Sequence, residues 1–272
     1  MSDKTILITG CSSGIGRATV KYFQNKGWNV IATMRTPEKE EELANLDNVL
    51  VAKLDVTDLE SIQNAVKTGI EKFGKIDALV NNAGYGAWGP LEAFPRENVI
   101  RQFNTNVIGL LDVTRAVLPH FRENKSGTIV NITSVCGKIA FPFGALYCGT
   151  KFAVEGISEA LNYELEKIGC KVKIVEPAAI ATDFTGRSLD FQNDESMGEY
   201  QEMVEPWWKG MEASQSAFSE PVVAAESIYE AVTDGTSKLR YEVKDGAVEL
   251  MALRKQSDDE TISDFVKPVF GL

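Results

Sequence analysis

Short apolar runs alternate with longer helical segments along most of this chain, and that alternation restricts the fold more than any other feature. The runs are rich in Val, Ile and Leu, which is typical of strands covered on both faces. Strands separated by helices predict right-handed βαβ units and a three-layer α/β fold, a doubly wound parallel sheet of about seven strands. The expected strands span residues 5–9, 29–33, 48–54, 76–81, 128–133, 171–176 and 239–243, and the expected helices span 14–26, 38–45, 58–73, 97–119, 147–168 and 221–234.

Composition excludes several classes of function. The 272 residues carry 28 Lys and Arg against 39 Asp and Glu, a formal charge of −11, so the chain lacks the basic surface that nucleic acid or an anionic membrane would need. No apolar run reaches the roughly 18 residues of a membrane span, and residues 1–10 do not resemble a signal peptide. We therefore expect a cytoplasmic protein that acts on a small molecule.

Cysteine and histidine usage argues against metal chemistry. The four cysteines form no C-x-x-C pair, so we expect free, mostly buried thiols. His120 is the only histidine, which excludes a site with several histidine ligands, and a capping or surface role is expected for it. No metal is predicted.

The chain contains no linker or repeat, so residues 1–272 are predicted to form one domain. The regular pattern is lost between residues 182 and 220, where aromatic and Met side chains are scattered among polar ones. Long connections inside α/β domains are usually functional, so this insertion is predicted to be a lid over a substrate. The alternative is a helical excursion that only packs on the sheet.

A glycine-rich turn lies between the first strand and the first helix, in the sequence TGCSSGIG. Gly10, Gly14 and Gly16 allow the backbone to turn and to approach a pyrophosphate, and the helix that follows offers free N–H groups to the anion. Ser12 and Ser13 add hydroxyl donors. This order of strand, glycines and helix predicts a dinucleotide site.

The end of the second strand indicates which dinucleotide. A carboxylate there would accept the ribose hydroxyls of NAD, but this chain has none and places Arg35 directly after the strand. A guanidinium binds a 2′-phosphate, so NADP(H) is favoured over NAD(H). Asp55 follows the third strand, where it is placed to meet the adenine, and the Asn81–Gly84 turn ends the fourth strand at the same edge of the sheet.

Three tyrosines, Tyr22, Tyr147 and Tyr163, each precede a lysine by four positions. Tyr22 belongs to the helix after the glycine loop, and Tyr163 lies about 160° around the helix from Tyr147. Only Tyr147 begins its helix just after a strand end that carries a hydroxyl, that of Ser134. We therefore assign Tyr147, Lys151 and Ser134 to one site.

With TGCSSGIG, DVTD, NNAG, FNTNVIG, NITS and YCGTK in this order, the chain resembles the short-chain dehydrogenase/reductase family, in its single-domain form with a Rossmann fold. The resemblance implies that Tyr147 is the general acid/base, supported by Lys151, Ser134 and Asn106. Lys151 would lower the pKa of the phenol and hold the nicotinamide ribose, Ser134 would bind the substrate oxygen, and Asn106 would position a water. The residues expected to contact the cofactor are Gly10, Ser12, Ser13, Gly14, Ile15, Gly16, Arg35, Asp55, Val56, Asn82, Ala83, Gly84, Tyr147, Lys151, Pro177, Ile180 and Thr182.

One position departs from the family pattern, because Ala178 stands where Gly usually follows Pro177. A glycine-like backbone there would strain Ala178. The candidate substrate-wall residues are mostly aromatic and predict a bulky apolar carbonyl or alcohol, with Arg187 and Lys209 kept as alternative contacts for a charged substrate. These wall residues are Tyr85, Trp88, Val135, Cys136, Phe141, Phe143, Phe184, Trp207 and Trp208.

The predicted function is NADP(H)-dependent hydride transfer between a ketone or aldehyde and an alcohol. The alternatives are an NAD-dependent alcohol dehydrogenase and a non-catalytic dinucleotide-binding regulator. The resemblance also implies a homodimer or homotetramer, built through the helices predicted at 97–119 and 147–168.

Overall fold

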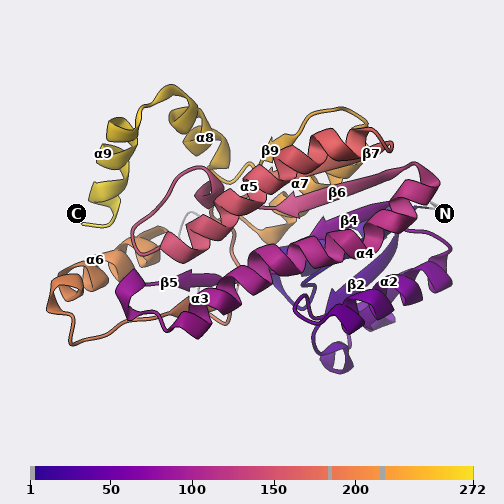
Figure 1. Ribbon diagram of the computed structural model, residues 1–272, viewed down its shortest axis with the longest axis horizontal. Coiled ribbons are helices and arrows are strands. Elements are labelled where there is room, and N and C mark those ends of the chain that lie inside the picture. Colours follow the sequence, from indigo (N-terminus) through magenta and orange to yellow (C-terminus); the bar gives the residue numbers. More distant parts are fainter. Residues whose placement is uncertain (1–3, 183–185, 215–217, 272) are drawn as a thin grey trace.

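The structure is a computed structural model that describes residues 4–182, 186–214 and 218–271 (Figure 1). Its central sheet has seven parallel strands in the order β3-β2-β1-β4-β6-β7-β9, which confirms the predicted α/β fold. The strands are β1 (Thr5–Ile8), β2 (Asn29–Met34), β3 (Val49–Lys53), β4 (Ala78–Asn81), β6 (Gly127–Ile132), β7 (Cys170–Glu176) and β9 (Arg240–Glu242).

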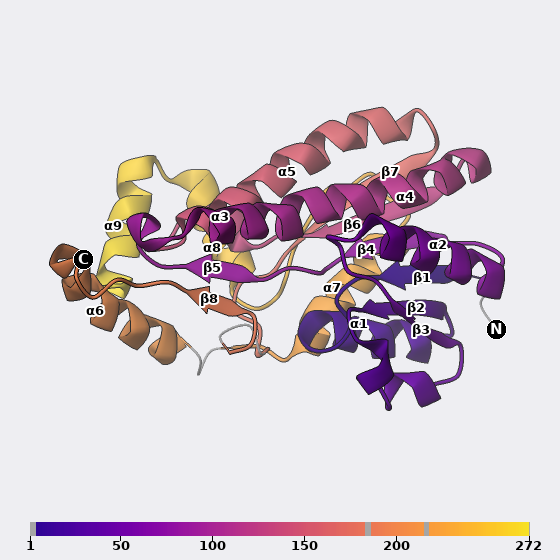
Figure 2. The same ribbon diagram turned by 60° about the horizontal axis from the view of Figure 1, so that its bottom comes forward.

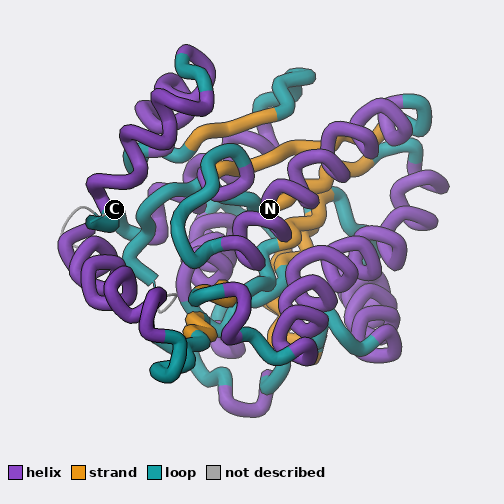
Figure 3. The backbone as a smooth tube through the Cα atoms, turned by 60° about the vertical axis from the view of Figure 1, so that its left-hand side comes forward, coloured by secondary structure: helices purple, strands orange, loops and turns teal. Residues whose placement is uncertain are grey.

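Helices cover both faces of this sheet (Figure 3). The cluster under α1 and α7 contains Phe23 and Ile228, and the cluster under α2, α4 and α5 contains Ile62, Val117 and Leu165. All five side chains are at least nine-tenths buried, which explains why the strands between them are apolar on both faces. The helices are α1 (Gly14–Asn25), α2 (Leu59–Phe73), α3 (Arg96–Phe103), α4 (Gly109–Asn124), α5 (Ala145–Glu166), α6 (Gly198–Ser214), α7 (Pro221–Thr233), α8 (Ala247–Gln256) and α9 (Asp259–Val269).

Two of the predicted helices need correction. Residues 38–45 form two 3₁₀ turns, Pro37–Lys39 and Leu43–Asn45, because Glu40 has an extended backbone and its carboxylate accepts the Leu43 N–H. The helix predicted at 97–119 is interrupted by a π-helical turn at Asn104–Ile108, which separates α3 from α4.

Elements outside the predicted sheet lie together beyond the carboxyl ends of its strands (Figure 2). Two short strands, β5 (Gly86–Trp88) and β8 (Leu189–Phe191), pair in parallel, and α6, α8 and α9 lie on the same side. The 182–220 insertion therefore contributes β8 and α6. Their tryptophan-rich cluster gathers around the carboxyl-terminal edge of the sheet, where α/β folds hold their ligands.

The four cysteines are free and buried, as predicted. His120 bridges elements, since its Nε2 accepts the Ile76 N–H at 3.1 Å. Within the described ranges, no helix is long and apolar enough to cross a membrane, and no group of three or more His, Cys, Asp or Glu side chains could hold a metal ion.

One carboxyl is buried at the end of β7. Glu176 is 1% exposed, and among the described residues neither of its side-chain oxygens has a hydrogen-bond partner. Burial, reinforced by the charge of Glu155, raises its pKa from 4.5 to about 7, against the attraction of Arg240, whose Nε lies 3.7 Å away. The native protein therefore holds a proton between pH 4.5 and 7 that the unfolded chain has already released.

We predict that Glu176→Gln stabilises the protein at pH 8 and changes little at pH 5. Because the raised pKa favours the protonated native state, stability falls as pH rises from 4.5 to 7, and the full cost of about 3 kcal/mol is present above pH 7. Thermal unfolding should show a Tm gain of roughly 5 °C at pH 8.

The control is Glu242→Gln on β9, because Glu242 is paired with Lys255 at 2.9 Å and should bring no gain at pH 8. An equal Tm change for Glu176→Gln at both pH values would contradict a charged carboxylate as the cause.

Candidate active site

The glycine loop closes tightly on itself. Gly10 and Gly14 have φ of +72° and +57°, and a Cβ on Gly16 would lie 2.3 Å from the carbonyl oxygen of Gly10, so side chains are excluded there. Ser13 is the N-cap residue of α1, but its side chain makes no capping hydrogen bond and the first turn carries no acidic residue. The N-terminus of α1 is therefore electrostatically suited to a phosphate.

Hydrogen bonds fix this loop to the turn after β4. The Asn82 side chain donates to the carbonyl oxygens of Thr9 (2.9 Å) and Gly10 (3.1 Å). In return, the Thr9 hydroxyl accepts the N–H groups of Asn82 and Ala83, each at 3.0 Å. Gly84 comes next and lies against Asn106. The predicted phosphate loop and the Asn81–Gly84 turn are thus one rigid unit.

Two arginines lie near the end of β2, in different electrostatic states. Arg17 is bound by Glu40 at 2.6 Å and by Glu42 at 2.5 Å, and its hydrogen bond lowers the pKa of Glu40. Arg35 is exposed and forms no ion pair with any residue that the structure describes. Of the two, Arg35 is the cation left for an anionic ligand.

Asp55 and Val56 follow β3, as the motif predicts. The Asp55 carboxylate accepts the Thr57 N–H at 2.9 Å and the Thr57 hydroxyl at 2.7 Å, which orders the turn. Val56 is buried and packs closely on Gly109 of α4. A Cβ placed on Gly109 would lie 2.7 Å from the Cβ of Val56.

Ser134, Tyr147 and Lys151 come together at the ends of β6 and α5. The Ser134 hydroxyl accepts the Cys136 N–H at 3.1 Å and also hydrogen-bonds the Tyr147 phenol. Lys151 lies one turn along α5 from Tyr147, with its Nζ 5.6 Å from the Tyr147 ring and 2.9 Å from the carbonyl oxygen of Ile132. The other candidate tyrosines are elsewhere: Tyr163 is 74% exposed, and the ring of Tyr22 packs on Tyr229.

Burial controls the protonation of this group. It raises the pKa of the Tyr147 phenol well above 10, and the Ser134 hydrogen bond only partly opposes the shift. Burial also lowers the pKa of the Lys151 ammonium to about 8, against the charges of Cys136 and Glu155. At neutral pH the phenol is therefore neutral and the lysine is charged, whereas the family resemblance implied a phenol with a lowered pKa.

The π-helical turn positions Asn106. Its Oδ1 accepts the Tyr85 N–H at 3.1 Å, and its Nδ2 donates to the Tyr85 carbonyl oxygen at 2.9 Å and to the Thr150 hydroxyl at 3.2 Å. Thr150 immediately precedes Lys151, so these contacts join the turn after β4 to α5. A π turn inside a long helix is frequent at functional sites, because the extra residue redirects a side chain.

The loop after β7 is unstrained at Ala178. That residue does not have a positive φ, and its N–H donates to Asp245 Oδ2 at 2.8 Å. Ser219 pairs with this loop through Ala179 and Ala181, a pattern that leaves the Ile180 N–H without a partner among the described residues. Asp245 and Ser219, which lie outside the motif, therefore hold the backbone at 177–182, and this backbone accommodates alanine at position 178.

An aromatic cluster covers Tyr147. Trp88 lies 5.5 Å from the Tyr147 ring and 5.7 Å from Trp207, which is 1% exposed and donates its indole N–H to the carbonyl oxygen of Pro142. Trp208 packs on Phe191, and Phe143 lies within 6.4 Å of both Phe191 and Trp207.

The other residues predicted to form the substrate wall lie in different parts of the structure. Val135 and Cys136 are buried beside Ser134, and the Tyr85 hydroxyl accepts a hydrogen bond from Arg101. Phe141 turns away to Phe270 and lines a separate cavity of 410 Å³. Phe184 lies outside the described residues, and Lys209 is exposed and paired with Glu205 at 2.7 Å.

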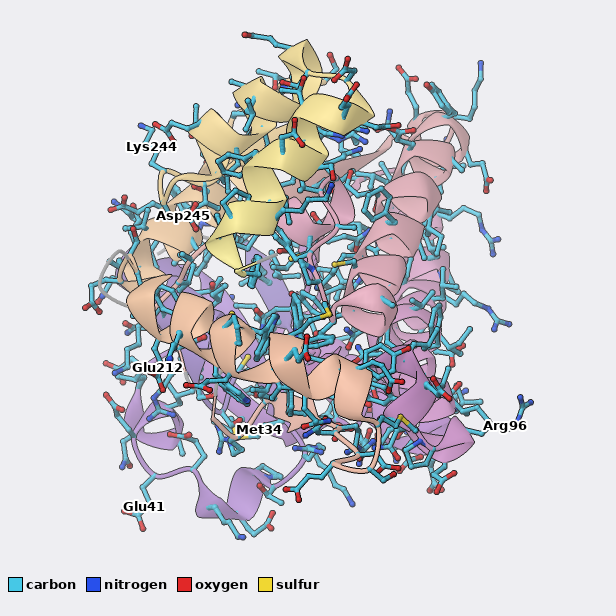
Figure 4. The ribbon with its side chains drawn as sticks, turned by 90° about the vertical axis from the view of Figure 1, so that its left-hand side faces the viewer. Met34, Glu41, Arg96, Glu212, Lys244 and Asp245 are labelled. Atoms are coloured by element: carbon cyan, nitrogen blue, oxygen red, sulfur yellow. The ribbon has the colours of Figure 1, made fainter. Side chains whose placement is uncertain are left out.

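Sequence reasoning missed Asp245 and underestimated Arg187. Figure 4 views the molecule from the end that carries α6, on which Glu212 lies. In this view Asp245 appears on one side of α6, and Met34, the last residue of β2, appears on the other. Asp245 precedes a glycine with φ of +95°, and Asp-Gly pairs are a turn signal that could have drawn attention to it. Arg187 contacts the glycine loop through Ser13, which no motif indicates.

Comparisons with known proteins agree with this geometry. An uncharacterized oxidoreductase of Schizosaccharomyces pombe is 43% identical over 239 residues, covering 88% of this chain and 100% of the relative. The crystal structure of a short-chain dehydrogenase from Streptomyces avermitilis superposes with a TM-score of 0.84 at 33% identity, covering 97% of this chain and 96% of that one. The structure of ElxO with NADP bound superposes with a TM-score of 0.73 at 27% identity, covering 90% and 99%. The short chain dehydrogenase family profile matches residues 4–193, and this chain belongs to that family of oxidoreductases.

Proposed function

We propose that this protein is an NADP(H)-dependent carbonyl reductase that transfers hydride to a bulky apolar ketone or aldehyde. The observation that carries the proposal is the group formed by the buried Ser134 and Tyr147 with the partly buried Lys151, which lies at the carboxyl edge of the sheet under an aromatic cluster. A neutral phenol beside a hydroxyl donor is the arrangement that protonates and stabilises a carbonyl oxygen as it gains negative charge.

Each residue has a distinct role in this proposal. Tyr147 donates its phenolic proton to the substrate oxygen, and Ser134 donates a hydrogen bond to the same atom. The Lys151 ammonium stabilises the charge left on the phenol, and Asn106 holds a water from which the proton is replaced. When bound, NADP(H) supplies the hydride. Because burial keeps Tyr147 protonated, the phenol is in the form that can donate a proton to a carbonyl oxygen.

The cofactor preference rests on Arg35. The glycine loop and the α1 N-terminus suit the diphosphate of either cofactor, but β2 is followed by an exposed guanidinium without an ion pair in the described part of the chain. A 2′-phosphate would pair with Arg35. The solved neighbours bind either cofactor, since ElxO holds NADP and a reductase from Brucella melitensis holds NADH, so the choice depends on Arg35.

The substrate class rests on the aromatic cluster. Trp88 packs on the Tyr147 ring, and Trp207 and Phe143 extend this flat apolar surface behind Trp88. Such a wall favours an aromatic or long aliphatic carbonyl over a sugar or a carboxylic acid. The predicted lid, residues 182–220, supplies Trp207 and Trp208 to this wall.

We predict that Tyr147→Phe lowers kcat for NADPH-dependent reduction of an aryl ketone by about 10²–10⁴-fold, because the proton donor is lost. NADPH binding, followed by cofactor fluorescence, should remain within a few-fold of wild type. Tyr163→Phe on the exposed face of the same helix is the matched control and should keep full turnover. Near wild-type kcat for Tyr147→Phe would remove Tyr147 from the mechanism.

We predict that Arg35→Ala weakens NADPH binding at least tenfold and leaves NADH binding within about twofold, since only NADPH carries the 2′-phosphate. Fluorescence titration with both cofactors measures this directly. Arg17→Ala is a poor control, because Arg17 forms an ion pair with Glu40. The control is instead Arg115→Ala, which removes an exposed arginine on α4. Equal losses for the two cofactors would contradict a 2′-phosphate contact.

We also propose a homodimer or homotetramer assembled through α4 and α5, which lie side by side (Figure 1). Large apolar side chains are exposed here, including Ile108 (47%) in the π-helical turn just before α4 and Phe152 (46%) on α5. Light scattering should give a multiple of the 29.8 kDa chain, and Ile108→Glu with Phe152→Glu should return it to a monomer. A wild-type monomer at micromolar concentration would contradict this assembly.

A further inference from the structure

A buried carboxylate lies one turn beyond Lys151 on α5. Glu155 follows Lys151 by four positions and is 3% exposed, so its carboxylate is shielded from solvent close to the residues proposed for proton transfer. Residues four apart on a helix share a face, with their Cβ atoms about 5–6 Å apart. Tyr147, Lys151 and Glu155 are therefore successive members of one stripe along α5.

Two cations hold Glu155 in place. Its Oε2 atom accepts a hydrogen bond from Arg240 Nε of β9 at 3.0 Å, and the Lys138 ammonium lies 3.1 Å from the same atom. Its Oε1 atom is buried and has no hydrogen-bond partner among the described residues. Because both cations come from outside α5, they fix the carboxylate relative to the rest of the site.

The turn that carries Ser134 packs on the same part of α5. A short 3₁₀ turn, Val135–Gly137, follows Ser134. A Cβ placed on Gly137 would lie 2.9 Å from Glu155 Cγ and 3.2 Å from the Lys151 carbonyl oxygen, so a side chain is excluded there. Glu155 thus forms part of the contact between the Ser134 turn and the helix that carries the lysine.

The charges present at neutral pH distinguish Glu155 among the neighbours of Lys151. Desolvation lowers the pKa of the Lys151 ammonium to about 8, and the anionic forms of Cys136 and Glu155 oppose this fall. A hydrogen bond with Cys148 and burial raise the pKa of the Cys136 thiol well above 9, so the thiol is uncharged at neutral pH. The Glu155 carboxylate is then the anion that favours a charged Lys151.

Other ionisable groups face this pair from the elements around it. Arg240 also pairs with Glu159, one turn farther along α5, and its Nε lies 3.7 Å from Glu176 at the end of β7. The groups that act on Glu155, on Lys151 or on their partners are Cys136, Lys138, Tyr147, Cys148, Glu159, Glu176, Arg240 and Glu242. Within this set Glu159 is the useful comparison, since its side chain is 49% exposed.

We propose that Glu155 is a positioning residue of the active site, whose buried carboxylate keeps Lys151 charged while Lys138 and Arg240 keep the carboxylate in place. The inference rests on the proposed function, in which the Lys151 ammonium stabilises the charge left on Tyr147. It adds to that function a residue that acts through the lysine and not on the substrate.

Loss of this carboxylate would leave the desolvation of Lys151 unopposed at neutral pH. The lysine of Glu155→Gln would then release its proton at a lower pH than the lysine of the wild type. A neutral amine does not stabilise the phenolate of Tyr147, so proton transfer should fail at a correspondingly lower pH.

The direct test is an NMR titration of lysine side chains labelled with carbon-13 at Cε, which requires neither cofactor nor turnover. The Lys151 signal is identified by its absence in Lys151→Met. It should titrate near pH 8 in the wild type, and its midpoint should fall by about one pH unit or more in Glu155→Gln. Glu155→Asp keeps a charge at this position and should show less than about half of that fall.

Glu159→Gln is the matched control, because it removes an exposed carboxylate that pairs with the same Arg240. Its Lys151 midpoint should stay within about 0.3 pH units of the wild type. Thermal unfolding at pH 7 checks that each variant is folded. If the unpaired cations prevent Glu155→Gln from folding, the double variant Glu155→Gln/Lys138→Gln removes the ion pair as a unit and should show the same fall.

The pH profile of kcat for NADPH-dependent ketone reduction is the second readout. The alkaline limb of the Glu155→Gln profile should move to lower pH by the same amount as the Lys151 midpoint, with the smallest loss of kcat at acidic pH. A loss of kcat that is equal at every pH would contradict an effect on the charge of Lys151 and would make the role of Glu155 structural.

Three results of the titration would overturn the inference. These are a Lys151 midpoint in Glu155→Gln within about 0.3 pH units of the wild type, an equal fall in Glu159→Gln, and a fall in Glu155→Asp as large as that in Glu155→Gln, which would make side-chain shape the cause. A wild type that reduces no ketone with NADPH would overturn the proposed function, whereas the titration would still measure the effect of Glu155 on Lys151.

Discussion

The hydrogen bonds between Thr9 and Asn82 are the contacts on which the rest of the site depends. They join the loop after β1 to the turn after β4 and hold both against the N-terminus of α1. The turn then meets Asn106, which reaches α5 through Thr150, next to Lys151. One continuous network thus runs from the phosphate end of the site to the residues proposed for proton transfer.

Two ionisable groups lie shielded from solvent at this edge of the sheet. Tyr147 is buried and Lys151 is partly buried, and desolvation shifts each pKa toward the neutral form. The shifts fit a reductase, since the phenol keeps the proton that it must donate while the ammonium still carries charge at pH 7. Desolvation, which usually opposes catalysis by charged groups, here keeps the phenol in the form that the proposed proton transfer requires.

Much of this was accessible from sequence. The seven strands, the glycine loop, the turn after β4 and the choice of Tyr147 over Tyr22 and Tyr163 all follow from local patterns. The errors were also local in origin: the Glu and Lys cluster at 38–45 has helical composition, but the Glu40 carboxylate is engaged by Arg17 and by the Leu43 N–H. A tertiary ion pair overrode propensity there. The π turn at 104–108 inserts one residue without changing the apolar pattern. The apolar periodicity therefore predicted one continuous helix at 97–119 and did not reveal the turn.

Sequence by itself determined the fold class, the order of the strands along the chain and the residue types that face the carboxyl edge, because each depends on patterns within about twenty neighbouring residues. Only the tertiary structure decided what closes the site. Asp245 anchors Ala178 from 67 positions away, Arg187 reaches Ser13 from 174, and Trp207 of α6 packs on Trp88. Such contacts leave no spacing in the sequence, because their geometry is set by packing between elements and not by the period of any one of them.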